Sequence, residues 1–240
     1  MRRDHRPYYL KHLYNKFQKW YAYRYLAPQC EYFGRGLHFM KPWQVEIFGG
    51  PISLGDYTTV IATPDKKVRF TVWSRDKNSG KIEIGKCCLV CPGTRIMSAT
   101  AITVGDGCMM AQSVSITDSD WHDIYDRSLS IGNTAAVKIG SNAWIGDSAI
   151  VSKGVTIGDN AIIGAGSIVL KDIPANAIAA GNPAVVMKYL DPDKPLKSRI
   201  QWLADPAKLA ADFEKLDREN MTGNTIAGWF RSMLFPRKGD

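Results

Sequence analysis

Hydrophobic residues recur at every sixth position over much of the chain. From Ile139 the sequence divides into IGSNAW, IGDSAI, VSKGVT, IGDNAI, IGAGSI and VLKDIP, and each block begins with Ile or Val. The same division gives IGKCCL, VCPGTR and IMSATA over 84–101, then VGDGCM, MAQSVS and ITDSDW over 104–121, with a weaker copy, LGDYTT, at Leu54. This period matches neither the 3.6 residues of a helical turn nor the alternation of a long strand.

A period of six is typical of a chain that turns a corner every six residues. Each flat face is then a short strand, and three faces make one coil of about 18 residues. We expect the first and fifth positions to point inward, and Gly, Asp or Asn to occupy corners that need a positive φ. A helix over 143–180 is disfavoured because Gly recurs and β-branched residues dominate. Since stacked coils bury a continuous aliphatic core, the sequence predicts an all-β solenoid.

Two interruptions and two flanks delimit this solenoid, which we predict over 45–188. The repeat lapses at about 63–80 and about 119–136, and long loops on a regular scaffold often carry function. The 1–44 flank contains a predicted basic, aromatic helix over about 8–25. The 189–240 extension contains a second predicted helix over about 206–220, which is followed by an apolar, basic tail. These flanks either pack on the solenoid or make a peripheral contact with an anionic membrane.

Composition and charge narrow the class of protein. The chain has 240 residues, 45% of them hydrophobic, which is enough for a substantial core. The formal net charge is +8, of which seven basic residues and Asp4 place +6 in residues 1–24. Because the remainder is nearly neutral, a nucleic-acid partner is not expected. No apolar run approaches the ~18 residues of a membrane span, and no secretory signal is evident. We therefore expect a cytoplasmic protein, with the inner face of the membrane as an open location.

The five cysteines are an odd number and fit no closed disulfide framework. Cys88 and Cys91 form a lone C-x-x-C with no histidine nearby in sequence, so no metal site is predicted. The six-residue register instead places Cys88 and Cys108 at the inward fifth position and Cys91 at the second. We interpret these residues as small core fillers.

His122 is the candidate catalytic residue, because it is the only histidine in the repeat region and lies in the second interruption. Asp118, Asp120 and Asp123 flank it, and a carboxylate can orient an imidazole and raise its basicity.

The repeats resemble the hexapeptide-repeat family, which implies a left-handed parallel β-helix with helical flanks. The D-S-D-W-H run at 118–122, followed by I-G-x-N-x-W-I-G, is similar to the active-site loop of the family's O-acetyltransferases. These include galactoside, maltose, nodulation-factor and surface-polysaccharide acetyltransferases. The resemblance implies that His122 is a general base and that acetyl-CoA, as co-substrate, transfers its acetyl group directly to a sugar or lipid-linked glycan hydroxyl in a ternary complex.

The resemblance also implies a homotrimer with acetyl-CoA bound between neighbouring subunits. The donor-binding candidates carried over are Trp144, Gly146, Gly164, Ala165, Gly166, Lys171 and Lys188. The chain departs from the family pattern at Asp147, Leu170 and Val185, which weakens the match at the donor site. Asp118, Asp120 and Arg127 are candidates for hydrogen bonds to sugar hydroxyls.

Other functions on the same scaffold fit less well. A zinc carbonic anhydrase of this type needs three histidines between coils, and the repeat region here has His122 alone. Serine acetyltransferases have a larger helical N-terminal domain than the 1–44 flank allows. Nucleotide-sugar pyrophosphorylases add a Gly-rich nucleotide-binding domain, which this sequence does not show. From a different class, a catalytically silent scaffold or a membrane-associated interaction protein stays open, and replacement of His122 distinguishes it from an enzyme.

Overall fold

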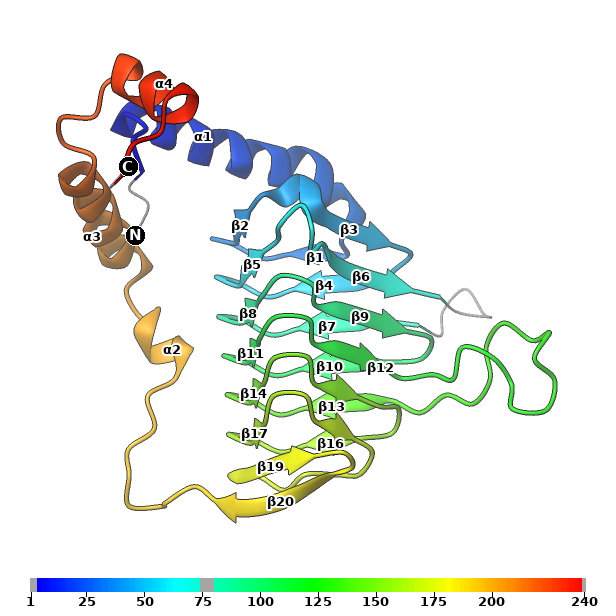
Figure 1. Ribbon diagram of the computed structural model, residues 1–240. Coiled ribbons are helices and arrows are strands. Elements are labelled where there is room, and N and C mark those ends of the chain that lie inside the picture. Colours follow the sequence, from blue (N-terminus) through cyan, green and yellow to red (C-terminus); the bar gives the residue numbers. More distant parts are fainter. Residues whose placement is uncertain (1–3, 74–79, 239–240) are drawn as a thin grey trace. The chain divides into compact units, whose positions relative to one another are not determined.

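Three parallel sheets are visited in turn by the chain in the computed structural model (Figure 1). The structure describes residues 4–73 and 80–238. The first sheet contains β1 (Tyr32–Phe33), β4 (Ile52–Leu54), β7 (Ile82–Ile84), β10 (Ile102–Val104), β13 (Val137–Ile139) and β16 (Thr156–Ile157). The second contains β2 (His38–Met40), β5 (Thr59–Ile61), β8 (Leu89–Val90), β11 (Met109–Met110), β14 (Trp144–Ile145), β17 (Ile162–Ile163), β19 (Ala177–Gly181) and β20 (Ala184–Tyr189). The third contains β3 (Val45–Phe48), β6 (Val68–Val72), β9 (Arg95–Ser98), β12 (Ser115–Thr117), β15 (Ile150–Val151) and β18 (Ile168–Val169).

Strands that follow one another in a sheet come from successive coils and pair in parallel, as β12 does with β9 and β15. The exception is β20, which folds back antiparallel on β19. Three parallel sheets with this order fit the predicted left-handed β-helix.

The predicted inward positions form the core. The first residues of the six blocks from Ile139 to Val169 are all at most 3% exposed, and so are the fifth residues from Ala143 to Ile173. Cys88 and Cys108 are completely buried at fifth positions, which confirms their interpretation as core residues. Burial of one aliphatic ladder by the next coil therefore holds the sheets together.

The corners of the coils adopt the left-handed backbone conformation at the fourth position of the repeat. Asn142, Ser148, Asn160 and Gly166 have φ values between 56° and 67°. The amide side chains of Asn142 and Asn160 are also hydrogen-bonded to each other at 2.9 Å. The prediction that Gly and Asn occupy corners with positive φ is confirmed at Asn142, Asn160 and Gly166, since both residue types tolerate this conformation better than others. Ser148 adopts the same conformation, which the prediction did not include.

The β-helix differs from the predicted range at its N-terminal end. β1 and β2 lie within the 1–44 flank yet pair with β4 and β5. The first interruption, predicted over 63–80, contains β6, and its residues 74–79 lie outside the described part of the chain. In these early coils charged and aromatic side chains cover the outer face, so the hydrophobic period is weaker than the backbone pairing.

The chain divides into two compact units. One consists of residues 21–202 and contains the β-helix, with short helical turns at Ala22–Leu26, Ala27–Gln29 and Pro42–Gln44 and helix α2 (Arg199–Trp202). The other consists of residues 1–20 and 203–240 and contains most of α1 (Tyr8–Tyr21) with α3 (Pro206–Asn220) and α4 (Ile226–Leu234).

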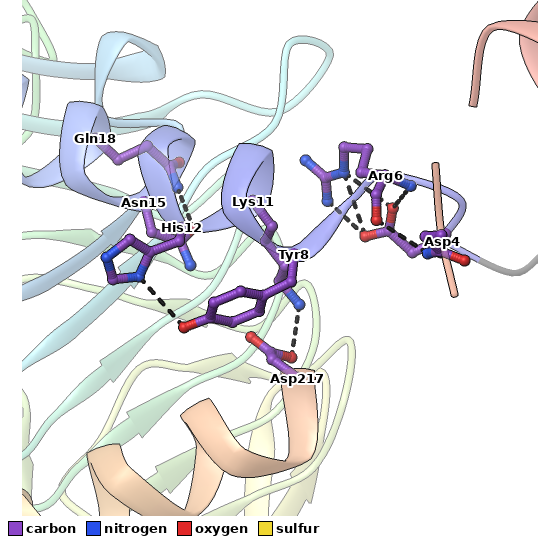
Figure 2. A network of polar contacts seen from close by, with 9 residues as sticks. Asp4, Arg6, Tyr8, Lys11, His12, Asn15, Gln18 and Asp217 are labelled. Carbon is purple, nitrogen blue, oxygen red and sulfur yellow. Dashed lines mark hydrogen bonds and ion pairs between the residues drawn. The ribbon is translucent and has the colours of Figure 1, made fainter. Parts of the chain in front are cut away.

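Polar contacts join the helices of the second unit. Lys11 Nζ of α1 lies 2.7 Å from Asp217 Oδ1 of α3 (Figure 2). The amide group of Asn224, just before α4, donates hydrogen bonds to the carbonyl oxygens of Asp4 and Arg6. Within the described ranges, none of the helices has the length and apolar character needed to cross a bilayer.

Candidate active site

A long loop leaves the β-helix at the corner between the third and first sheets, from the end of β12 to the start of β13 (Figure 1). Its two legs pair where they leave the coil: Ala135 N donates to the Asp118 carbonyl at 2.9 Å, and Asp120 N donates to that of Asn133 at 2.9 Å. His122 lies directly beyond this paired stem. The histidine is thus presented by a segment whose base has fixed backbone hydrogen bonds.

Asp118 anchors the stem to the preceding coil. Its carboxylate is completely buried, and it accepts hydrogen bonds from Ser98 Oγ at 2.7 Å, Ala99 N at 2.6 Å and Thr100 N at 2.9 Å. A buried carboxylate is stabilised by such donors. The prediction that Asp118 binds a sugar hydroxyl is therefore corrected, because its oxygens are satisfied inside the protein.

Asp120 forms an ion pair that sequence reasoning did not find. Lys153 Nζ lies 2.6 Å from Asp120 Oδ1, with each side chain about one-third exposed. Lys153 follows β15, one coil beyond β12, so the two residues meet only because the coils stack. No sequence signal identified this partner, since a lysine at a coil corner is ordinarily solvated.

The imidazole of His122 is exposed to solvent, as is Arg127 further along the loop. Asp123, predicted as a possible partner of the ring, accepts hydrogen bonds at Oδ1 from the backbone N–H groups of Tyr125 and Asp126, both at 2.9 Å. Gly132 faces the His122 carbonyl, where an added Cβ would lie 2.5 Å from the oxygen. A glycine is required at that point because the returning leg packs against the His122 backbone.

The predicted donor-binding residues fall into two regions of the chain. Lys171 follows β18 by two residues, as Lys153 follows β15, and the register of the two strands stacks these lysines at the same corner as the loop. Trp144 and Lys188 instead lie on the outer face of the second sheet. The register runs from Trp144 through Ile162 and Ile178 to Lys188, so the two form one row about 14 Å long at ordinary strand spacing.

The glycines of the predicted donor site have different roles in the fold. A Cβ at Gly146 would lie 2.6 Å from Ala165 N, and one at Gly164 would lie 2.9 Å from the Ala180 Cβ, so both are needed for contact between coils. Gly166 has φ +67°, and no heavy atom lies within 4 Å of the position that a Cβ would take there. Ala165 and Gly166 are exposed. Of Gly146, Gly164 and Gly166, Gly166 is the one that faces open space.

An exposed aromatic pair lies on the edge of the third sheet from which the loop leaves. Phe48 ends β3 and Trp73 follows β6, and their ring centroids are 4.6 Å apart with both side chains about half exposed. Trp73 N donates to the Ser98 carbonyl at 2.8 Å, and the Ser98 hydroxyl in turn bonds Asp118. Trp73 is therefore two strand spacings, about 10 Å along the sheet, from the base of the loop, and Phe48 is one strand further away.

Three-sided coils built from a six-residue repeat are typical of hexapeptide-repeat solenoids. A family model described as bacterial transferase hexapeptide (six repeats) matches residues 136–171. Polysialic acid O-acetyltransferase of Escherichia coli O1:K1 / APEC is 38% identical over 136 residues, which cover 55% of this chain and 41% of that protein. Galactoside O-acetyltransferase of Escherichia coli (strain K12) is 38% identical over 102 residues, covering 41% of this chain and 50% of that protein.

Among solved structures, a maltose O-acetyltransferase from Clostridium difficile 630 is 29% identical, with a TM-score of 0.38 over 69% of this chain and 73% of that one. The chain spans about half the length of the two curated relatives. In its repeats, the chain is similar to hexapeptide-repeat O-acetyltransferases.

Proposed function

We propose that the protein transfers an acetyl group from acetyl-CoA to a hydroxyl of a sugar or of a cell-envelope polysaccharide precursor. The observation that carries this proposal is the exposed imidazole of His122 on a loop whose stem is anchored by the buried carboxylate of Asp118. The relatives named as polysialic acid and galactoside O-acetyltransferases support both the acyl group and the acceptor class.

His122 acts as the general base in this reaction. A sugar hydroxyl has a pKa far above 7, so its proton must be removed as the oxygen attacks. The neutral imidazole takes that proton while the oxygen forms a bond to the thioester carbonyl carbon. The tetrahedral intermediate then collapses, the C–S bond breaks, and the imidazolium returns the proton to the CoA thiolate. Both substrates are present together, since transfer occurs directly from sulfur to oxygen.

The donor site is completed by a second copy of the chain. In one copy His122 and Lys171 lie at one corner, whereas Trp144 and Lys188 lie on the opposite, second sheet. A single molecule of acetyl-CoA reaches both groups when the corner of one subunit faces the second sheet of another, as in the predicted homotrimer. The exposed lysines then supply point charges for the CoA phosphates.

The sugar acceptor fits the aromatic pair of Phe48 and Trp73. A pyranose ring has an apolar C–H face that packs on exposed aromatic rings, while its hydroxyls bond polar groups. Asp120 and Arg127 remain candidates for those hydroxyls. We expect Trp73→Ala to raise the acceptor KM severalfold and to leave the acetyl-CoA KM unchanged. Equal KM values for the acceptor in both proteins would remove the aromatic pair from the acceptor site.

Replacement of His122 tests the proposed function. The purified protein is incubated with acetyl-CoA and a panel of cell-envelope sugars, and release of free thiol is followed. We expect His122→Ala to lower kcat/KM by about 10²–10⁴-fold, whereas the matched change His38→Ala, at an exposed histidine on β2, leaves it unchanged. A His122→Ala protein that folds and retains full transfer would favour the scaffold function instead.

A further inference from the structure

Helix α1 carries a stripe of large apolar side chains that are about half exposed. Tyr9, Leu13, Phe17 and Trp20 are spaced four, four and three residues apart, so they form one stripe along the helix. Their exposed fractions lie between 46% and 63%, and the rings of Phe17 and Trp20 stack at 5.6 Å between centroids. Four large apolar side chains on one exposed stripe exceed the scattered exposure that is usual for a surface helix.

The other side of α1 carries the polar contacts to α3. Tyr8 Oη donates to Glu214 at 2.7 Å. Lys11 pairs with Asp217, as Figure 2 shows. The helical positions of Tyr8 and Lys11 lie on the side of α1 away from the stripe. The acidic side chains of α3 are thus held against the polar face of α1, away from its apolar stripe.

Helix α4 adds exposed apolar side chains, and its Trp229 lies next to the apolar side chains of α1. Trp229 of α4, together with Leu10, Leu13, Tyr14 and Phe17 of α1, lines a groove of about 670 Å³. Beside Trp229, α4 and Phe235, which directly follows it, expose further apolar side chains with exposed fractions of 46% to 70%. The combined α1–α4 surface comprises Tyr9, Leu13, Phe17, Trp20, Ile226, Phe230, Met233, Leu234 and Phe235.

The charges of these two helices are of one sign. Neither α1 nor α4 contains an Asp or Glu, while α1 contains three lysines and α4 contains Arg231. Lys16 is exposed on α1 beside the stripe, and Lys19 is exposed further round the helix, toward the side of Tyr8. Apolar and aromatic side chains bordered by basic residues match the interface of a bilayer with anionic headgroups, where rings lie among the headgroups and lysines contact phosphates.

We propose that the α1–α4 surface binds the surface of an anionic bilayer, with α1 and α4 lying in the plane of the interface. The surface shares no residue with the proposed acetyl-transfer site, so this proposal does not depend on that function. A membrane-bound enzyme of this kind would meet acceptors that are themselves attached to lipid.

Cosedimentation of the full chain with vesicles tests the proposal. Vesicles of phosphatidylcholine with 30% phosphatidylglycerol, chosen as the anionic probe, are compared with pure phosphatidylcholine over a range of lipid concentrations. We expect partitioning at least 10-fold stronger on the anionic vesicles, decreasing as salt is raised. Equal partitioning on the two vesicles, or no partitioning on either, would overturn the proposal.

Matched variants assign the binding to the surface. Leu13→Glu and Leu234→Glu, each at an exposed position of the surface, should weaken partitioning at least 10-fold, whereas Leu216→Glu, at an exposed position of α3, should leave it unchanged. The double variant Lys16→Gln/Lys19→Gln should lose about 25-fold, or about fivefold per lysine. The control Lys208→Gln/Lys215→Gln removes the same charge from α3 and should keep the wild-type value.

Two further outcomes count against a bilayer. If the α3 controls weaken partitioning as much as the surface variants, binding depends on net charge alone and the proposal is wrong. If Leu13→Glu converts an oligomer of the wild-type chain to a smaller species in sedimentation velocity, while vesicles bind neither protein, the surface contacts a second copy instead. Circular dichroism of each variant establishes that the helices are retained.

Discussion

Replacement of Asp118 tests how the loop is held. In Asp118→Ala the donors Ser98 Oγ, Ala99 N and Thr100 N lose their acceptor. Ser98 and Ala99 are buried, so water cannot replace the carboxylate there. An unpaired buried donor costs about 1–3 kcal/mol, and two of them lower the free energy of unfolding by about 2–6 kcal/mol.

The isosteric change Asp118→Asn separates hydrogen bonding from volume. The amide oxygen still accepts from Ala99 N, and the Ser98 hydroxyl can rotate to accept from the amide group. Thr100 N–H then faces an NH₂ group, because a backbone donor cannot reverse its role. We expect a loss of about 1–3 kcal/mol, smaller than that of Asp118→Ala.

Urea denaturation measures both losses, and hydrogen exchange of the Ala99 and Thr100 amides shows whether they arise at this site. Asp126→Ala is the matched control, because Asp126 is an exposed carboxylate of the same loop that accepts hydrogen bonds from Ser128. Its effect should stay within about 0.5 kcal/mol. If Asp118→Ala lost no more stability than this control, the assignment of Asp118 as the anchor of the loop would be refuted.

Three further changes test other parts of the structure. Gly146→Ala should lower Tm more than Gly166→Ala, because only Gly146→Ala places a Cβ against a neighbouring coil. Gly166→Ala adds about 1–2 kcal/mol of backbone strain. The reverse order of Tm values in a thermal scan would contradict the coil contact at Gly146. Lys153→Met removes the ion pair of Asp120 and should lower the free energy of unfolding by about 1 kcal/mol or less, because the pair is partly exposed. A loss above about 3 kcal/mol, measured by urea denaturation, would show a more deeply buried pair. Burial raises the pKa of the Cys30 thiol to about 11, so less thiolate is present at pH 8. Iodoacetamide should therefore alkylate Cys30 at least 10-fold more slowly in the folded protein than in the unfolded chain. Equal alkylation rates, measured by mass spectrometry, would show that the thiol is not shielded.

The predicted site residues met different outcomes for physical reasons. The sequence pattern groups Asp118 with Asp120 as sugar ligands, because both precede His122 in an apparent loop. The structure separates them: Asp118 turns into the coil toward residues 98–100, and Asp120 pairs with Lys153. Asp118 and Asp120 are two positions apart, a spacing that in a regular strand places both side chains on the same side. At the start of this loop the side taken by each instead depends on the partners that the neighbouring coils present.

The N-terminal coils show where the six-residue pattern loses its strength. β1, β2 and β6 lie outside the predicted solenoid or within its first interruption. Their pairing is made by backbone groups, which any side chain permits, while residues such as Arg69 and Glu46 on the outer face form ion pairs with each other instead of a regular apolar pattern. The first and last coils of a solenoid lack one neighbour, so their side chains are less constrained to the repeat.

The sequence alone determined the coil, its inward positions and its left-handed corners, because each depends on residues at most six apart and on the burial of one face. It also located the loop that presents His122, since an insertion is visible wherever a regular period stops. The tertiary structure alone decided which residues meet across coils: the Asp118 anchor at Ser98, the pairing of Asp120 with Lys153, and the separation of Lys171 from the row of Trp144 and Lys188. These contacts join residues from different coils, and their geometry follows from the stacking register and the side of the sheet, which the spacing of residue types along the chain does not encode.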